Sequence, residues 1–373
     1  MDNTQSLLTI WSAAISAVTG RSAVNNAITV DRLAPPDFII AVGKAASGMC
    51  LGALDNFKDC PALVVTKYDH SDDELRKMPN VKVIESAHPV PDENSVSAGF
   101  QLIKAIQSLP DKSRLLMLVS GGASALAEAL PDGFTLDVLQ AMTDEMLSTG
   151  KTISEINCKR KEKSLIKDGK LLGTFTGQAI TVYAISDVEG DDIATIGSGI
   201  GDCFRAGNRG NSRIIASNCL ARDRASRAAT ELGLEVKLNE ETLYGDVFDL
   251  ASKLGPVIQT AEPGIYIWGG EPTVVLPPNP GQGGRNQSLA LALSEYLQDK
   301  PSITVLIAGT DGTDGPTAAA GGIIDQFTFG KEAKARLALT EANAGPYLEA
   351  SNSLFVTGPT NTNVMDLIIA IVV

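Results

Sequence analysis

The sequence predicts an α/β fold in two domains, each built on a parallel-rich sheet flanked by helices. Its 373 residues exceed what one hydrophobic core usually holds, which favours two domains. Short apolar runs end repeatedly in clusters of Gly, Ser, Asp or Thr, and helical patterns lie between them. Alternating strands and helices form parallel sheets, which bind ligands beyond the carboxyl ends of their strands.

Six segments carry the pattern of a buried strand that turns into a polar loop. They cover residues 38–48, 115–125, 182–192, 265–273, 305–315 and 354–363. Glycines that merely end strands explain any single loop, but six loops of the same polar types favour a shared site. Residues 236–249 separate the first three segments from the last three. We therefore expect domains at residues 1–236 and 237–373.

The negative net charge disfavours nucleic acid and anionic membranes as partners. The formal charge is −13 and the sequence pI is about 4.7. A field of this sign repels nucleic acid and anionic lipid surfaces, so an anionic substrate needs a local cationic pocket. We expect a small-molecule substrate and neither nucleic acid nor a membrane as partner.

Cysteines and the chain ends indicate the compartment. Five cysteines stand singly without a CxxC pair, which indicates neither a disulfide framework nor a zinc site. A reducing compartment, the cytoplasm, is expected. The N-terminal run LLTIWSAAISAV has no preceding basic region and predicts an amphipathic helix rather than a signal peptide. The C-terminal run LIIAIVV is too short to span a bilayer.

The first polar loop carries Lys44, directly after a predicted buried strand and before a predicted helix. A cation at a helix N-terminus is unfavourable unless an anion joins it, so this position favours a phosphate or carboxylate ligand. A solvated surface lysine is the alternative. The chain contains no G-x-x-x-x-G-K-[ST] pattern, so this is not a Walker A loop.

A second glycine turn contains Ser120, Gly121, Gly122 and Ser124, and its backbone N–H groups can form a nest for an anion. No G-x-S-x-G elbow surrounds either serine, and the chain has only two histidines, so a serine-hydrolase triad is poorly supported. His88 precedes a proline in a loop, where it either orients a substrate or serves capping and packing.

Three aspartates follow the third predicted strand, namely Asp187, Asp191 and Asp192. Their mutual repulsion is costly without a cation. Mg²⁺ prefers a few carboxylates together with substrate phosphates and water, which suits a split site drawn from Asp187 and Asp311. The alternative for Asp191 and Asp192 is that they cap the following helix.

In the second half of the chain, Arg285 leads a strong helical pattern after a flexible loop, Pro277–Gly284. Its planar, permanently charged guanidinium suits phosphate. Asn286 offers neutral hydrogen bonds to hydroxyl groups. Glu271 stands at a strand end, where a structural ion pair with a lysine and a functional role are equally supported.

The most polar loop follows the apolar run 305–308 and presents Asp311 and Asp314 among glycines. These glycines permit positive φ and close approach of a ligand, and short carboxylates reach a hard cation. We interpret the loop as a phosphate and magnesium site, with Thr310 and Asp314 among the phosphate-binding candidates.

Taken in order, the motifs resemble the class II glycerate kinases, the glycerate 2-kinase family with a C-terminal MOFRL domain. The resemblance covers nearly the whole chain through AVGKAASGM, SAHPVPDENS, VSGGASAL, INCKRKEKSLIKDGKL, ISDVEGDDIATIGSG, GGEPTV, GGRNQSLALA, AGTDGTDGPTAAAGG and TGPTNTNVMDL. It implies a Rossmann-like N-terminal domain, a MOFRL-type C-terminal domain and an active site in the cleft between them. It also implies ATP-dependent phosphorylation of D-glycerate at the 2-hydroxyl, giving 2-phosphoglycerate and ADP, with Lys44 and Arg285 central.

Two residues depart from the family pattern. Glu162 stands where the family usually has a histidine, and Ile200 stands where it usually has a proline. An imidazole replaced by a carboxylate would change how a substrate carboxylate is received. A kinase for a related hydroxy or sugar acid is therefore an alternative. The neighbouring basic run, residues 159–163, is typical of a solvated helix face.

The residues support a phosphoryl-transfer mechanism that depends on positioning and charge neutralisation. Mg²⁺ held by Asp187 and Asp311, with Asp192 as a further candidate ligand, would bridge the ATP phosphates. Lys44 and Arg285 would stabilise the transferred phosphoryl group and the glycerate carboxylate. Asp187 and Asp192 are also the candidates for the base, so the division between ligand and base stays open.

Two other classes of function remain, and the oligomeric state, for which a homodimer is considered, is also open. A hydroxypyruvate reductase would need a G-x-G-x-x-G motif after an early strand, and the chain has none. A non-catalytic sugar-acid-binding protein would bind glycerate without producing ADP.

Overall fold

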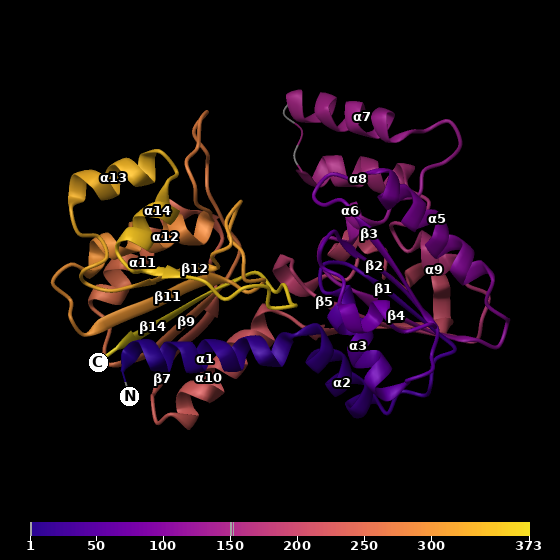
Figure 1. Ribbon diagram of the computed structural model, residues 1–373, viewed down its shortest axis with the longest axis horizontal. Helices are drawn as coiled ribbons and strands as arrows, with labels where there is room; N and C mark the ends of the chain where they lie inside the picture. Colours follow the sequence, from indigo (N-terminus) through magenta and orange to yellow (C-terminus); the bar gives the residue numbers. More distant parts are fainter. Residues whose placement is uncertain (1, 150, 152) are drawn as a thin grey trace. The chain divides into compact units, whose positions relative to one another are not determined.

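The computed structural model describes residues 2–149, 151 and 153–373 (Figure 1). These residues divide into two compact units, which we name the inserted unit and the split unit. Thr19–Ala216 form the inserted unit. Both ends of the chain, residues 1–18 and 217–373, form the split unit.

This division differs from the expected domains at 1–236 and 237–373. Helix α1, Asn3–Val18, packs along α10, Asn218–Glu231, and α10 packs on strands of the C-terminal sheet. Helix α1 therefore belongs with residues far beyond it in the chain. A linear cut could not reveal this, because the apolar pattern of α1 does not show which sheet it covers. The expected cleft site stays a prediction.

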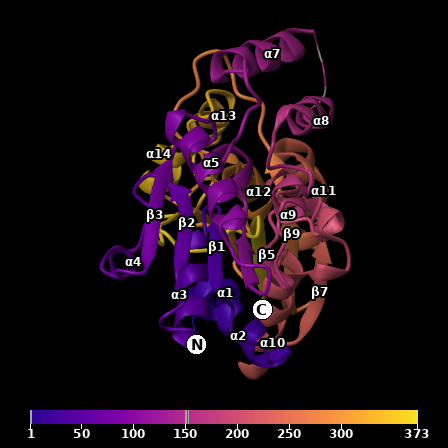
Figure 2. The same cartoon turned by 90° about the vertical axis from the view of Figure 1, so that its right-hand side faces the viewer.

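The inserted unit is built on a six-stranded parallel sheet with the order β3-β2-β1-β4-β5-β6. Figure 2 shows β1, β2 and β3 side by side. The strands are β1 Phe38–Val42, β2 Ala62–Lys67, β3 Val81–Ser86, β4 Arg114–Val119, β5 Ala179–Ile185 and β6 Gly210–Ala216. The helices are α2 Gly20–Asp31, α3 Ala46–Asn56, α4 Asp73–Arg76, α5 Glu93–Gln107, α6 Ala123–Leu126, α7 Leu136–Ser148, α8 Ile153–Lys163 and α9 Lys170–Gly173, with short 3₁₀ turns at Glu189–Asp191, Ile196–Gly199 and Phe204–Arg209.

The core of the inserted unit also encloses an ion pair. Lys167 Nζ donates to a carboxylate oxygen of Glu128, and neither side chain is exposed to solvent. Ser164 Oγ donates to the other oxygen of Glu128 at 2.5 Å, and the backbone N–H of Ala129 does so at 3.1 Å. Burial lowers the pKa of Lys167 to about 8, although Glu128 opposes this shift. This pair joins the segment after β4 to the segment after α8.

The split unit is built on a six-stranded sheet with the order β13-β12-β11-β14-β9-β7. The strands are β7 Val236–Glu241, β9 Gly264–Gly270, β11 Ile303–Gly309, β12 Gly321–Ile324, β13 Leu354–Phe355 and β14 Asp366–Val372, and β8 Gly245–Asp246 pairs separately with β10 Pro272–Thr273. Besides α1 and α10, the helices are α11 Val247–Gln259, α12 Arg285–Ser294, α13 Glu332–Thr340 and α14 Ala344–Ala350, with a 3₁₀ turn at Glu295–Leu297.

The second sheet is less parallel than expected. Strand β14 lies antiparallel between β9 and β11, and β12 is antiparallel to both of its neighbours. In this sheet β7 and β9 pair in parallel, and the other neighbouring strands pair antiparallel. Strands β13, β11, β9 and β7 nevertheless point in the same direction. All seven residues of β14 are buried. The C-terminal apolar run is thus a central strand of this sheet.

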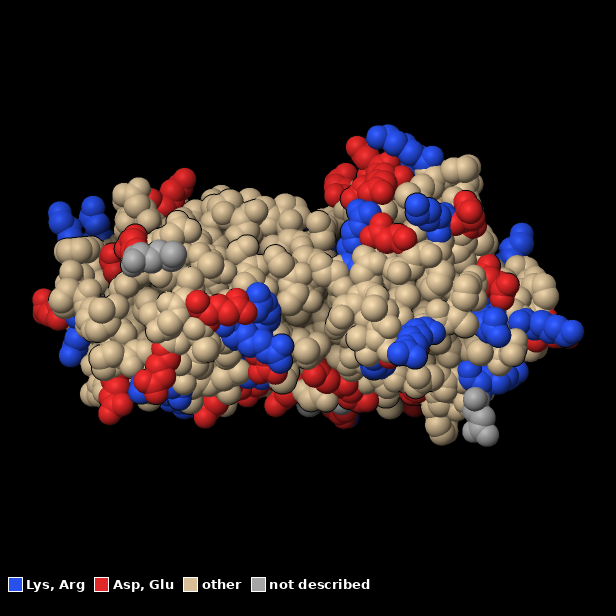
Figure 3. Space-filling model, turned by 90° about the horizontal axis from the view of Figure 1, so that it is seen from below, with Lys and Arg blue, Asp and Glu red and all other residues tan. Residues whose placement is uncertain are grey.

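The apolar length of the helices and the surface charge both bear on the expected partners. Among the described residues, no single helix is both long and apolar enough to cross a membrane, and one bent pair, α1 with α2, meets the length and composition criteria only. Figure 3 shows basic and acidic side chains interspersed over the face that it presents, without a large patch of one sign.

Candidate functional site

The strand order of the first sheet creates a switch point between β1 and β4. The chain continues from β1 to β2 on one side and from β4 to β5 on the other. Loops at such a point diverge and leave a crevice beyond the carboxyl ends of the strands. The loops that carry Lys44 and Ser120–Gly122 both begin there, as the sequence predicted.

Backbone contacts hold these two loops together. The N–H of Lys44 donates to the carbonyl of Gly121 at 2.9 Å, and the N–H of Ala45 donates to Ser120 Oγ at 3.0 Å. Gly43 has φ +133°, and a Cβ there would lie 2.2 Å from Ser120 Oγ. Only glycine fits this crossing. The Ser120 hydroxyl therefore supports the loop, whereas the predicted anion nest relied on backbone N–H groups of this turn.

Three predicted side chains lie over the glycine turn. A Cβ on Gly122 would lie 3.1 Å from both Lys44 Cγ and His88 Cδ2. A Cβ on Gly121 would lie 1.7 Å from Asp187 Oδ2. The structure thus brings Lys44, His88 and Asp187 together around two glycines that leave room for them. Both classes of group that phosphoryl transfer uses, a cation and a carboxylate, are present here.

His88 is a neutral imidazole in this arrangement. Burial lowers its pKa to about 4, and the positive charges of Lys44 and Lys67 contribute, as does His70. At neutral pH the ring therefore offers one donor and one acceptor rather than a charge. This fits the predicted role of orienting a substrate.

His88 should make the fold sensitive to mild acid. Below pH 6.5 an unfolded chain protonates this ring, whereas the folded protein resists protonation down to about pH 4. The contribution of His88 to the free energy of unfolding is therefore complete above pH 6.5 and is lost as the pH falls towards 4. We expect His88→Gln to lose less stability than the wild type between pH 7 and 5 in urea unfolding. Equal losses in the two proteins would contradict the buried, neutral imidazole.

Two other predicted polar residues of this unit have structural partners. Asp192 Oδ1 accepts from the N–H of Ala194 at 3.0 Å, and its Oδ2 accepts from Thr195 Oγ1 at 2.8 Å. Both carboxylate oxygens of Asp192 are thus engaged by the following turn, although the N-cap of the 3₁₀ helix after it is Thr195 rather than Asp192. Ser124 Oγ lies 2.8 Å from Ser198 Oγ.

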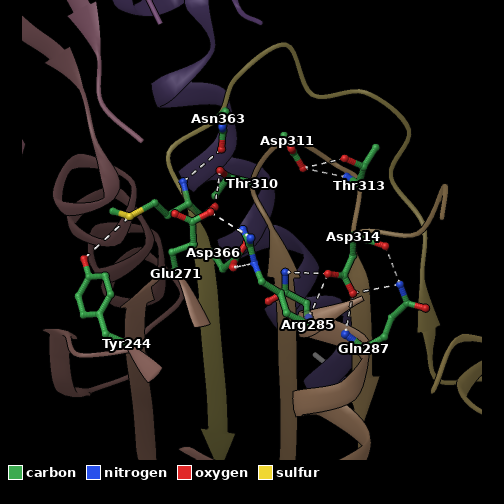
Figure 4. A network of polar contacts seen from close by, with 12 residues as sticks. Tyr244, Glu271, Arg285, Gln287, Thr310, Asp311, Thr313, Asp314, Asn363 and Asp366 are labelled. Atoms are coloured by element: carbon green, nitrogen blue, oxygen red, sulfur yellow. Dashed lines mark hydrogen bonds and ion pairs between the residues drawn. The ribbon is translucent and has the colours of Figure 1, made fainter. Parts of the chain in front are cut away.

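In the split unit, Arg285 lies among carboxylates (Figure 4). Its Nε donates to Asp366 Oδ2 at 2.6 Å and its Nη2 to Asp366 Oδ1 at 3.2 Å, while Nη1 contacts Glu271 Oε1 at 3.0 Å. Glu271 thus has an ion-pair partner, but this partner is an arginine rather than a lysine. Burial raises the pKa of Asp366 to about 7 even though Arg285 opposes the shift.

Asp366 was missed by the sequence reasoning. It is the first residue of β14, and strand pairing places it between Gly270 of β9 and Gly309 of β11. A Cβ on Gly309 would lie 3.2 Å from Asp366 Oδ1, so glycine gives the carboxylate its space. The available signal was an aspartate immediately before an apolar run, which typically marks a strand end near a site.

Asp314 caps helix α12 rather than facing an open loop. Its Oδ1 accepts from the N–H of Asn286 at 3.1 Å, and its Oδ2 accepts from the N–H of Gln287 at 2.8 Å and from Gln287 Nε2 at 3.0 Å. A carboxylate at this position satisfies N–H groups that a helix leaves unpaired. Burial nevertheless raises the pKa of Asp314. Asp314 therefore holds the start of the helix that carries Arg285, and it is a poor phosphate ligand.

The remaining predicted groups of this loop also support the backbone. Thr310 Oγ1 donates to the carbonyl of Met365 at 2.6 Å and accepts from the N–H of Val364 at 2.8 Å. Asp311 Oδ1 accepts from the N–H and the hydroxyl of Thr313 at 3.0 and 3.1 Å (Figure 4). Asn286 Oδ1, in contrast, is buried without a hydrogen-bond partner among the described residues.

The predicted magnesium ligands do not form a cluster by themselves. Among the residues that the structure describes, no group of three or more His, Cys, Asp or Glu side chains could hold a metal ion. Asp187 belongs to the inserted unit and Asp311 to the split unit. The donor chemistry still fits Mg²⁺, since this ion takes one or two carboxylates and completes its shell with phosphate and water.

The two departures noted in the sequence lie in different environments. Glu162 pairs with Lys159 at 2.8 Å on α8, and both side chains are about half exposed. This agrees with a solvated helix face. Ile200 is 1% exposed and packs in the hydrophobic core of the inserted unit.

Comparisons with known proteins identify the family. Residues 6–203 match the model described as "Domain of unknown function (DUF4147)", and residues 264–366 match the MOFRL family. The glycerate 2-kinase of Pyrococcus horikoshii is 33% identical over 90% of this chain and 87% of that relative. The chain belongs to the glycerate 2-kinase family. The D-glycerate 2-kinase of Thermotoga maritima is 31% identical over 90% of both chains.

Solved structures agree with this membership. The crystal structure of the Thermotoga maritima glycerate kinase has a TM-score of 0.89 against this chain at 29% identity, and it covers 99% of both chains. The α/β fold expected for a glycerate 2-kinase family member is thereby confirmed. As a member of the glycerate 2-kinase family, this chain is a phosphotransferase.

Proposed function

We propose that this protein transfers the γ-phosphoryl group of ATP to the 2-hydroxyl of D-glycerate, giving 2-phosphoglycerate and ADP. The observation that carries the proposal is the similarity to two glycerate 2-kinases, at 33% and 31% identity over 90% of the chain. The grouping of Lys44, His88 and Asp187 at the switch point supports it, since phosphoryl transfer requires mainly positioned charges.

Each group has a role in this proposal. Lys44 neutralises charge on the phosphoryl group, and Arg285 receives an anionic group of a substrate. The neutral imidazole of His88 hydrogen-bonds the acceptor. Mg²⁺ would be held by Asp187 of the inserted unit with water, and it would supply neutralisation of the phosphate oxygens. Asp187 is also our candidate for the base, although a loose transition state needs little early proton removal.

The test is ADP release from the purified protein with ATP, magnesium and D-glycerate, followed by identification of the product by ³¹P NMR. We expect release that requires glycerate and yields 2-phosphoglycerate. Activity only with another hydroxy or sugar acid would keep the chemistry and reassign the substrate. Glycerate binding without ADP would favour a sugar-acid-binding protein. Cytoplasmic location and a homodimeric state stay predictions.

A hydroxypyruvate reductase is the second candidate. Two Agrobacterium vitis relatives, 31% and 30% identical, carry that name provisionally. The strand order of the first sheet is also common in dinucleotide-binding domains. The loop after β1 reads VGKAASG, however, and lacks the glycine spacing that admits a pyrophosphate. Oxidation of NADH by hydroxypyruvate, followed at 340 nm, is expected to be absent.

A further inference from the structure

Arg285 contacts two carboxylates that differ strongly in burial. The side chain of Asp366 is 2% exposed and faces the Nε and Nη2 edge of the guanidinium with both oxygens. The side chain of Glu271 is 46% exposed and contacts only Nη1. Strand pairing between β9 and β14 brings both carboxylates to this position, because Asp366 pairs with Gly270. The two partners of Arg285 are therefore not equivalent.

The cost of releasing each carboxylate follows from this difference. Separating Asp366 from Arg285 would leave a buried carboxylate without its cation, which is strongly unfavourable. Releasing Glu271 returns a half-exposed carboxylate to water, and exposed ion pairs contribute little. An incoming anion can therefore displace Glu271 at small cost, but it cannot displace Asp366.

The charge balance also requires such a displacement. Asp366, Glu271 and Asp314 all act electrostatically on Arg285. If Glu271 stays on Nη1, an additional anion meets a carboxylate at that position. If Glu271 leaves, its position on Nη1 can accept an oxygen of a carboxylate or a phosphate.

We propose that Asp366 positions the guanidinium of Arg285 and that Glu271 occupies the anion-binding side of that guanidinium until a substrate anion takes its place. This inference rests on the proposed function only for the identity of the anion, either the carboxylate of glycerate or a phosphate of ATP. Glu271 thereby sets substrate affinity by competition. The sequence left a structural ion pair and a functional role open for Glu271, and this proposal combines the two.

Equilibrium binding tests the competition without turnover. Dissociation constants for inorganic phosphate, D-glycerate and ADP would be measured by isothermal titration calorimetry on the full chain. We expect Glu271→Gln to tighten binding of the anion that Arg285 receives by about two- to fivefold. Tightening for glycerate alone identifies a carboxylate, and tightening for phosphate or ADP identifies a phosphate. The double variant Glu271→Gln with Arg285→Gln should lose this gain.

Glu235→Gln is the matched control. Glu235 forms an exposed pair with Lys237 at 2.8 Å, and it precedes β7, whose first residue pairs with Ile265 near the start of β9. The control removes the same charge near the start of β9, whereas Glu271 follows the end of that strand. Unchanged or weaker binding of all three ligands by Glu271→Gln would overturn the proposal, as would an equal gain in Glu235→Gln. If Glu271→Gln binds the anion more tightly but the protein produces no ADP, only the proposed function would be contradicted.

A kinetic readout separates competition from a merely structural role. We expect Glu271→Gln to lower KM for the same substrate by a similar factor while kcat changes little. A structural role would instead reduce kcat or stability. A fall in kcat without a fall in KM would overturn the proposal.

Discussion

Lys44→Ala and Arg285→Ala should each lower kcat for ATP-dependent glycerate phosphorylation by about two orders of magnitude or more. Each removes a cation that we propose to contact an anionic group of a substrate. Lys44 lies before the N-terminus of α3, where its charge is unfavourable unless an anion binds. The measurement is steady-state ADP release, with folding checked by circular dichroism.

Matched variants separate these effects from a general change of charge. Lys104→Ala removes an exposed lysine of the inserted unit, and Arg336→Ala removes a half-exposed arginine of the split unit. Both should keep a near-normal kcat. Arg285→Ala also deprives Asp366 of its partner, so some loss of stability is expected in addition. Near-normal turnover in Lys44→Ala and Arg285→Ala together would move the active site elsewhere.

Lys167→Met should lower the free energy of unfolding by about 3–5 kcal/mol, the usual cost of breaking a buried ion pair. The variant leaves the carboxylate of Glu128 buried with only Ser164 and a backbone N–H as donors. Urea unfolding followed by far-UV circular dichroism measures this loss. Adding Glu128→Gln should restore part of it, because the second change removes the uncompensated charge.

Lys159→Met is the control for that experiment. It makes the same chemical change at a lysine that is half exposed and pairs with Glu162. Exposed pairs contribute about 0–1 kcal/mol, so this variant should unfold almost as the wild type does. A Lys167→Met protein with wild-type stability would show that the buried pair contributes nothing net.

Sequence reasoning found the strands whose apolar runs end in polar loops. Each predicted segment overlaps one strand of a six-stranded sheet, namely β1, β4, β5, β9, β11 and β13 in chain order. β14 was not recognised, because a strand buried on both faces has no alternation of polar and apolar residues. Its central, antiparallel place is also why the second sheet departs from the expected parallel pairing.

At the site, the sequence predicted which residues lie at strand ends better than it predicted the hydrogen bonds of their side chains. Lys44, His88 and Asp187 converge because carboxyl ends of parallel strands share one edge. The pattern could not show that the side-chain oxygens of Asp192 and Asp314 are engaged by nearby donors. Such bonds depend on loop geometry that forms only after the strands have paired.

Helix α1 is made long before most of the residues that it packs against. Leu7, Ile10 and Ala14 are fully buried in the split unit, and the ring of Trp11 meets that of Phe355 edge-on at 5.7 Å. In synthesis α1 precedes the inserted unit, and its partners among residues 217–373 are made only after that unit. The apolar face of α1 therefore stays without its partners from the split unit until the inserted unit has been synthesised.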